Sequence, residues 1–279
     1  MFDYSAITKL DLENDIKNTL NISLEQIQKI KNEVTPSLAL FDLFERTISD
    51  LSGRVAFMAD VSKEEDIRNY GNEAESIIEN FLLEVTTDKE LFEKFKSIKT
   101  NTLDKESIKY FDEVIRDFID AGHELDNDKK TRLIEIEKKL IDLEINFSKN
   151  IAADKSEVIL NRSQLKGLSI DELNNFRKEE DNFIVTMAYP DINAVLENCE
   201  IRDSRKEVWK TFNNRAISSN SPILKEAVTL RNEKANLFGF NTWAEYRLQY
   251  RMAKSPQNVI KMYDNLVPKL QKAAQNEKV

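Results

Sequence analysis

The run His123-Glu124-Leu125-Asp126-Asn127 is the part of the sequence that comes nearest to a catalytic motif. In the zinc motif H-E-x-x-H, two histidines one helical turn apart bind the metal and the glutamate acts as a general base. Here the fifth position is Asn127, and the chain contains no second histidine. The run also follows Gly122, so we expect a turn. The pattern therefore predicts a solvated turn histidine and no zinc site.

Cys199 is the only cysteine in the chain, so no internal disulfide is possible and a reducing compartment is expected. A cysteine nucleophile needs a nearby base and a lowered pKa. The neighbouring Glu197 and Glu200 would raise the pKa of this thiol instead. We therefore expect Cys199 to be a buried or half-buried structural residue.

Carboxylate pairs are the other candidates for acid–base chemistry. The pairs Glu64/Glu65 and Glu179/Glu180 lie in charge-rich stretches, and adjacent residues do not face one another on a helix. We expect both pairs on solvated faces. The sequence has no G-x-G-x-x-G, P-loop or G-x-S-x-G motif.

Aromatic residues gather toward the C-terminal end, and we expect them mainly in the core. They are Trp209, Phe212, Phe238, Phe240, Trp243 and Tyr246. As an alternative, Tyr246, Tyr250 and Tyr263 could line a groove for a peptide, because phenols combine an apolar ring with a hydrogen-bonding tip.

The composition favours a mainly α fold. The 279 residues contain only five glycines and five prolines, which are too few for the many turns of a β-rich fold. A net charge of −9 argues against a general nucleic-acid binder. No basic-plus-apolar leader and no run of eighteen apolar residues occurs, so we expect a cytoplasmic protein without a signal peptide or membrane span.

Capping signals followed by amphipathic patterns predict a series of helices in the first half of the chain. The expected starts are Ser23 with Gln26 (ending near Val34), Pro36 (with an apolar stripe to Met58), Ser62 with Glu65, Thr87 with Glu90, and Asp104 (ending at Gly122). From 127 to 153, apolar residues from Leu133 to Phe147 recur every three or four positions. This pattern predicts a long helix packed on one side, with a coiled-coil seam as the alternative.

The pattern changes after Lys155. Segments 156–160 and 182–187 are rich in β-branched residues and predict a paired hairpin or small sheet. Helices are expected from Ser169 to near Lys178, from Tyr189 through Leu196, and over 202–215 with Val208, Trp209 and Phe212 facing inward. We therefore divide the chain into an N-terminal helical region, 1–153, and a region with a small β element and further helices, 154–279.

Residues 220–266 carry the clearest start and stop signals in the chain. They predict a helix capped by Ser221 with Pro222 in its first turn, a glycine cap at Gly239, a Thr242/Glu245 capping box, and a helix starting at Ser255-Pro256.

This stretch resembles the M3 family of zinc metallopeptidases, in its branch of thimet oligopeptidase, oligopeptidase A and dipeptidyl carboxypeptidase. The matching residues are Arg231, Ala235, Leu237, Phe238-Gly239-Phe240, Ala244, Tyr246, Met252-Ala253-Lys254-Ser255-Pro256 and Val259. The segments 133–150, 158–167 and 187–190 are similar to the family in the same order, so the resemblance covers most of the chain.

The resemblance implies a neurolysin-like, mainly α fold in which two helical lobes flank a deep channel, and the cleavage of short peptides by a zinc-bound water. The family's zinc ligands are two histidines of H-E-x-x-H and a later glutamate, and this sequence contains no such motif. No catalytic or metal-binding residue can therefore be assigned here, and the substrate-binding residues are unknown. The resemblance implies that the chain is an N-terminal, non-catalytic portion that forms one channel wall, inactive alone, with zinc held only by the full-length parent.

Several alternatives stay open. The chain could be a stand-alone helical module that binds peptides or a partner protein, and the parent could be an endopeptidase or a dipeptidyl carboxypeptidase. The last predicted helix runs from Pro256 to Val279 without a glycine cap, which favours a truncated chain. Removal of a lobe would expose apolar surface, so we also expect self-association through the C-terminal helices.

Overall fold

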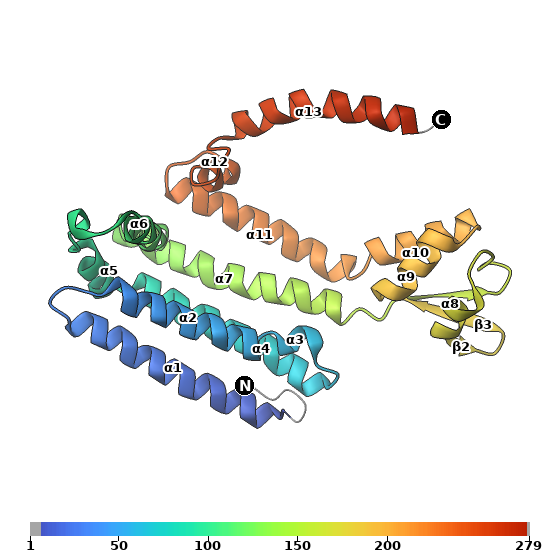
Figure 1. The fold of residues 1–279 in the computed structure, drawn as a ribbon, viewed down its shortest axis with the longest axis horizontal. Helices are drawn as coiled ribbons and strands as arrows, with labels where there is room; N and C mark the ends of the chain where they lie inside the picture. Colours follow the sequence, from blue (N-terminus) through green and yellow to red (C-terminus); the bar gives the residue numbers. More distant parts are fainter. Residues whose placement is uncertain (1–6, 278–279) are drawn as a thin grey trace. The chain divides into compact units, whose positions relative to one another are not determined.

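The computed structural model describes residues 7–277 and is mainly α with one small antiparallel sheet, as the sequence predicts (Figure 1). The chain forms two compact units. The first unit comprises Met1–Ile145 and Lys225–Val279, and the second comprises Asn146–Leu224. The division into 1–153 and 154–279 stays a prediction. Among residues 7–277, no helix combines the length and the apolar character needed to cross a membrane.

The first unit begins with six α-helices packed around an aromatic core. They are α1 (Lys9–Asn32), α2 (Leu38–Val55), α3 (Met58–Val61), α4 (Glu65–Thr87), α5 (Lys89–Lys96) and α6 (Lys105–Asp120), with a short 3₁₀ turn, η1 (Thr100–Thr102), before α6. The ring of Phe41 lies 4.8 Å from that of Phe95, and Phe118 lies 5.7 Å from Phe95. These buried rings join α2, α5 and α6, and ring pairs at such distances add to the energy of burial.

The predicted helix start at Ser23 is wrong. Helix α1 is continuous through this position, and its N-terminus is capped by a Thr8/Asp11 capping box. Ser23 is fully buried in the middle of the helix. The residues Leu12, Ile16, Ile27 and Ile30 form one buried stripe along α1, which lies beside α2 (Figure 1). Tertiary packing of this stripe therefore overrides the local capping signal.

Two further helices, α4 and α5, are not capped by the residues that the sequence predicts. Helix α5 is capped by Asp88, whose carboxylate accepts the Leu91 N–H at 2.9 Å, whereas the Thr87 hydroxyl donates back to the Leu83 carbonyl. A carboxylate is the stronger acceptor at a helix N-terminus. Helix α4 starts at Glu65 without a side-chain cap, and Ser62 instead ends α3. The starts predicted near Pro36 and at Asp104 are confirmed, with Ser37 and Asp104 as the capping residues.

The long predicted helix is α7 (Asn127–Ala152), and it buries Leu133, Ile136, Leu140 and Leu143 as expected. In the first unit α7 runs along the later part of α11 (Ile217–Leu237). Ion pairs join the two helices, among them Arg132–Glu233 and Lys139–Glu226. These contacts hold α7 and α11 together along one side of a cavity described below.

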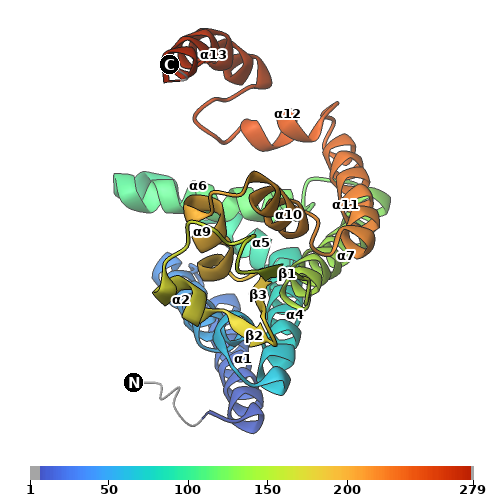
Figure 2. The ribbon, with the colours of Figure 1, turned by 90° about the vertical axis from the view of Figure 1, so that its right-hand side faces the viewer.

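The second unit contains the sheet, in the order β1-β3-β2, and helices α8 to α10 (Figure 2). The strands are β1 (Glu157–Asn161), β2 (Arg177–Glu179) and β3 (Asn182–Thr186), and the helices are α8 (Ile170–Asn175), α9 (Tyr189–Asn198) and α10 (Arg202–Asn213). Strands β1 and β3 pair antiparallel with Ile159 opposite Ile184, which confirms the predicted pairing.

The sequence patterns do not predict strand β2. They predict that the helix from Ser169 continues to near Lys178, whereas α8 ends at Asn175 and β2 follows it. All three residues of β2 are charged and exposed, so no alternation of apolar side chains marks it as a strand. The segment is a strand because its backbone pairs with that of β3. A turn in which Glu180 has a φ of 53° connects the two strands.

Two expectations for the later helices are also wrong. Helix α11 starts at Ile217, so Pro222 lies inside it and Ser221 is not its cap. The buried Asn220 side chain donates to the Phe147 carbonyl and accepts from Asn150, which holds this turn helical despite the proline. Trp209, expected to face inward, is 57% exposed, while Val208 is buried.

The other signals predicted in residues 220–266 are confirmed. Gly239 follows α11 at φ 82°, and a Thr242/Glu245 capping box starts α12 (Trp243–Leu248). Helix α13 (Pro256–Glu277) begins after Ser255, whose hydroxyl accepts the Asn258 N–H. These turns determine where the side chains of α11 and α12 point.

Candidate functional site

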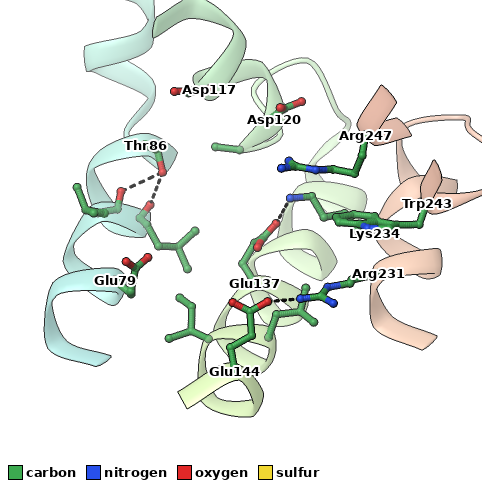
Figure 3. Close-up of a pocket in the computed structure, with 15 residues that line it drawn as sticks. Glu79, Thr86, Asp117, Asp120, Glu137, Glu144, Arg231, Lys234, Trp243 and Arg247 are labelled. Carbon is green, nitrogen blue, oxygen red and sulfur yellow. Dashed lines mark hydrogen bonds and ion pairs between the residues drawn. The ribbon is translucent and has the colours of Figure 1, made fainter. Parts of the chain in front are cut away.

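A cavity of about 620 Å³ lies within the first unit, between α4, α6, α7, the later part of α11, and α12 (Figure 3). Its polar and aromatic lining consists of Glu79, Thr86, Asp117, Asp120, Glu137, Glu144, Arg231, Lys234, Trp243 and Arg247. Leu82, Leu83, Leu140 and Ile141 supply apolar walls. The volume lies in the range of small-ligand sites, but most of the lining side chains are polar or charged.

Two of the basic residues in the cavity are already neutralised. Arg231 forms an ion pair with Glu144, and Lys234 forms one with Glu137 (Figure 3). Lys234 is buried, and its ammonium lies 5.6 Å from the centre of the Tyr246 ring. These contacts fix the α7–α11 side of the cavity.

Trp243 forms the aromatic part of the lining and is held at the first position of α12 by the Thr242 cap. The guanidinium of Arg247 lies 5.6 Å from the Trp243 ring and that of Arg231 lies 6.0 Å from it. Arginine over an indole face is a favourable cation–π arrangement. The capping box predicted from sequence therefore also orients the arginines of the site.

Three carboxyl groups form no ion pair with the other lining residues, although the charges of Lys234 and Arg247 act to lower the pKa of Asp120. They are Glu79 on α4 and Asp117 and Asp120 on α6. Burial raises the pKa of each of these carboxyl groups above its usual value. The lining has five carboxyl groups and three basic groups, so its charge is negative when all are ionised. The cavity is therefore suited to a positively charged group.

The three tyrosines proposed for a peptide groove lie in different environments. Tyr246 is buried, with its ring stacked on Phe238 at 5.2 Å, and burial followed by the charge of Asp120 raises the pKa of its phenol. Tyr250 and Tyr263 are exposed, and neither lines the cavity. Tyr246 thus belongs to the core that supports α12, as the main sequence interpretation expects.

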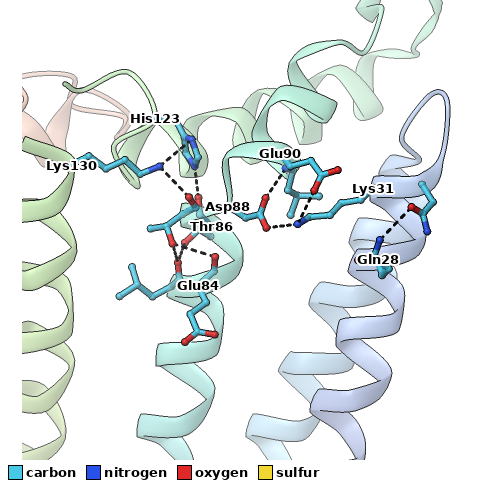
Figure 4. A network of polar contacts seen from close by, with 12 residues as sticks. Gln28, Lys31, Glu84, Thr86, Asp88, Glu90, His123 and Lys130 are labelled. Atoms are coloured by element: carbon cyan, nitrogen blue, oxygen red, sulfur yellow. Dashed lines mark hydrogen bonds and ion pairs between the residues drawn. The ribbon is translucent and has the colours of Figure 1, made fainter. Parts of the chain in front are cut away.

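His123 lies in a turn, as predicted, but it is half-buried rather than solvated. Its ring stacks on Phe92 at 4.5 Å, and Nε2 lies 2.8 Å from the Thr86 carbonyl oxygen (Figure 4). Lys130 approaches Nδ1 at 3.4 Å. Burial lowers the pKa of His123, so the neutral ring donates from Nε2 and accepts at Nδ1. Both nitrogens are occupied by structural contacts.

Cys199 is buried at the end of α9, as predicted, with its Sγ 3.2 Å from the Gln164 carbonyl oxygen. The candidate carboxylates Glu64, Glu65, Glu179 and Glu180 are exposed. Within residues 7–277, no group of three or more His, Cys, Asp and Glu side chains is placed to hold a metal ion. The described residues therefore do not fit a zinc centre.

Sequence patterns did not predict the cavity. Arg231 belongs to the segment that carries the family resemblance, but Glu79, Asp117 and Asp120 resemble ordinary surface acids in sequence. The spacing of three between Asp117 and Asp120 places them on one helix face, which is the only local signal they carry. Their gathering opposite Arg247 depends on the packing of α4, α6 and α12.

Comparison with known proteins relates the chain to peptidases. Residues 195–278 match the model of Peptidase family M3. This range contains Arg231, Lys234, Trp243 and Arg247 of the cavity.

Individual relatives extend the similarity over most of the chain. A thimet-like oligopeptidase of Dictyostelium discoideum is 29% identical over 84% of this chain and 36% of its own length. Saccharolysin of Saccharomyces cerevisiae is 27% identical over 92% of this chain and 38% of its own length. Oligopeptidase A of Haemophilus influenzae is 30% identical over 58% of this chain and 26% of its own length. The chain thus spans well under half the length of these relatives.

Proposed function

Because the chain belongs to Peptidase family M3, we propose that it is the N-terminal, non-catalytic portion of a zinc-dependent oligopeptidase that hydrolyses short peptides. In that enzyme it forms one wall of the substrate channel. The observation that carries the proposal is similarity to oligopeptidases over 84% and 92% of this chain but only 36% and 38% of theirs. A cytoplasmic location is part of the proposal and is supported by the single, unpaired Cys199.

Zinc in such an enzyme would activate a water molecule for attack on the peptide bond. The residues of this chain are poorly suited to hold that metal. The single histidine uses both ring nitrogens in contacts with Thr86 and Lys130, and Cys199 faces the Gln164 carbonyl. We therefore propose that the chain alone does not hydrolyse peptides and that the ligands come from the rest of the enzyme.

A peptidase assay on the purified chain tests this division of roles. Quenched fluorescent peptides are incubated with the chain and zinc, with and without 1,10-phenanthroline. We expect no chelator-sensitive hydrolysis, and robust chelator-sensitive cleavage would contradict the proposed inactivity.

A chimeric protein tests whether this chain is part of a larger enzyme. This chain replaces the matching segment of the Dictyostelium relative, and circular dichroism checks that the product is folded. We expect chelator-sensitive peptide cleavage by the chimera. A folded chimera without activity would count against a role as the N-terminal portion of an M3 oligopeptidase.

A stand-alone helical binding module is the second candidate. It is supported by α13, whose apolar side chains Ile260, Tyr263, Leu266 and Leu270 are all exposed. The coding sequence after Val279 separates the two candidates. A stop codon favours the module, and an open frame that reaches H-E-x-x-H favours the peptidase.

A further inference from the structure

We propose that the exposed face of α10 is a docking surface for an acidic, amphipathic segment of a partner protein. This α10 face consists of three cations and three aromatic residues, which are Arg202, Lys206, Lys210, Tyr189, Trp209 and Phe212. It lies within the second unit and shares no residue with the cavity of the first unit. Its role is therefore separate from the proposed function.

Three cations of α10 lie on one exposed side of the helix. Arg202, Lys206 and Lys210 are spaced by four residues, which places them on consecutive turns about 6 Å apart along the axis. All three are exposed, and none forms an ion pair with another described residue. Arg205 of the same helix, by contrast, donates to the Cys199 carbonyl oxygen. Within residues 7–277 the row of three cations therefore has no acidic partner.

The charge around this row is opposite to that of the whole chain. Between 202 and 215 the sequence has five basic and two acidic residues, although the net charge of the chain is −9. The two acids, Asp203 and Glu207, lie on the neighbouring side of α10 and are not ion-paired with the row. No acidic residue occurs from 208 to 225. The α10 face is therefore complementary to an acidic partner.

An exposed aromatic row runs beside the cations. Trp209 is 57% exposed, and Tyr189 at the start of α9 is 67% exposed. Phe212 follows Trp209 by three residues on α10, and its ring packs edge-on against that of Tyr189 at 5.7 Å, where α9 and α10 pack together (Figure 2). Tryptophan, tyrosine and arginine are the residues that most often dominate binding energy in protein interfaces. Trp209 is therefore the anchor for an apolar side chain of the partner.

The two rows together favour an amphipathic protein segment over a nucleic acid or a membrane. A helix with an apolar stripe and acids on successive turns matches both rows. Nucleic acid also binds surfaces with cations and aromatic rings, but a chain with a net charge of −9 repels a ligand that carries a charge on every phosphate. A short acidic segment carries its charges only where the three cations meet them.

Fluorescence anisotropy with the full chain tests the partner class. The probe is a fluorescein-labelled peptide with two copies of the heptad Leu-Glu-Glu-Leu-Leu-Glu-Glu, and its neutral analogue has glutamine in place of each glutamate. At low salt we expect a dissociation constant below about 100 μM for the acidic peptide and at least about tenfold weaker binding of the analogue. Added salt should weaken the binding of the acidic peptide. Equal binding of the analogue would overturn the proposal, and so would no binding of the acidic peptide at millimolar concentration.

Two charge-matched double variants locate the binding. Lys206→Gln/Lys210→Gln should weaken binding of the acidic peptide at least about threefold, because it removes two cations of the α10 face. Lys269→Gln/Lys272→Gln removes the same charge from exposed lysines of α13 and should keep the affinity within about twofold. Equal losses in the two variants would show that only the net charge matters and would refute the α10 face.

The aromatic anchor is tested in the same way. Trp209→Ala should weaken binding of the acidic peptide at least about fivefold. Tyr263→Ala is the control, since Tyr263 of α13 is 53% exposed and lies outside the α10 face, and it should keep the affinity within about twofold. Circular dichroism verifies that each variant is folded, which is expected because the substituted side chains are exposed. An unchanged affinity of Trp209→Ala would refute the anchor and with it the docking surface.

Other occupants of the surface give different results. Tighter binding of a polyuridylate oligonucleotide or of phosphatidylserine vesicles than of the acidic peptide would overturn a protein partner. The chimera with the Dictyostelium relative should bind the acidic peptide as this chain does. An active chimera that no longer binds the peptide would show that the rest of the enzyme covers the α10 face, which would overturn docking of a separate partner and retain the proposed function. A chimera that binds the peptide but is inactive would do the reverse.

Discussion

Lys234 of α11 and Glu137 of α7 form an ion pair in which the lysine side chain is only 11% exposed and the glutamate 22%. The pair lies beside the Tyr246 ring and joins the two helices at the cavity. Charges in such a place are retained only when each has a partner, because desolvation of a single charge is unfavourable. This one ion pair therefore contributes both to the stability of the fold and to the shape of the cavity.

Lys234→Met should destabilise the chain by about 2 kcal/mol, since it leaves Glu137 without its partner while the apolar stem is retained. Urea unfolding followed by circular dichroism measures the change. Lys139→Met is the control, because the Lys139–Glu226 pair is about half exposed on both sides and its loss should cost less than about 1 kcal/mol. Equal losses for the two variants would contradict the importance of burial.

Gly71→Ala should destabilise the packing of α3 on α4. A Cβ at Gly71 would lie 2.5 Å from the backbone nitrogen of Ala59, so one of the helices must shift. We expect a loss of about 1–3 kcal/mol in the free energy of unfolding.

Gly53→Ala is the matched control on α2, where an added Cβ meets no atom within 4 Å. Alanine is the better helix former, so this variant should gain about 0.5–1 kcal/mol. Thermal and urea unfolding of both variants measure the difference. A neutral Gly71→Ala would show that α3 is not packed closely on α4.

His123 should make stability depend on pH. Burial lowers its pKa in the folded state, so below the usual histidine pKa of about 6.5 the unfolded chain binds the proton more readily than the folded chain. Its contribution is therefore fully present above that value and is lost as the pH falls toward the lowered folded pKa. Urea unfolding of wild type and His123→Gln from pH 5 to 7.5 isolates this effect. The wild-type chain should lose more stability on acidification than the variant does, and parallel pH profiles would contradict the expectation.

Self-association through α13 is a further prediction. The exposed residues Ile260, Tyr263, Leu266, Val267 and Leu270 recur at helical spacing and form an apolar stripe. Sedimentation velocity should show concentration-dependent association of the wild-type chain. Leu266→Lys places a charge on the stripe and should favour the monomer, whereas Gln275→Lys adds the same charge on another face and should not. A wild-type chain that stays monomeric at high concentration would disprove this role of α13.

Local chemistry in the sequence determined much of the secondary structure. The scarcity of glycine and proline predicted a mainly α fold, and the stripe from Leu133 to Phe147 predicted α7 almost to its ends. Gly239, the Thr242/Glu245 box and Ser255 act through bonds to residues within a few positions, so their signals could be interpreted without a fold. The same short-range pattern carried the resemblance to the M3 family.

The tertiary structure decided what depends on residues distant in sequence. Ser23 lies inside α1 because a buried stripe continues through it, Pro222 lies inside α11 because Asn220 is anchored on the end of α7, and β2 exists because β3 offers backbone partners. The cavity has the same origin, since Glu79, Asp120 and Arg247 are far apart along the chain and meet only when their helices pack. Desolvation then changes the pKa of Glu79 and Asp120, a property that no single segment of sequence contains.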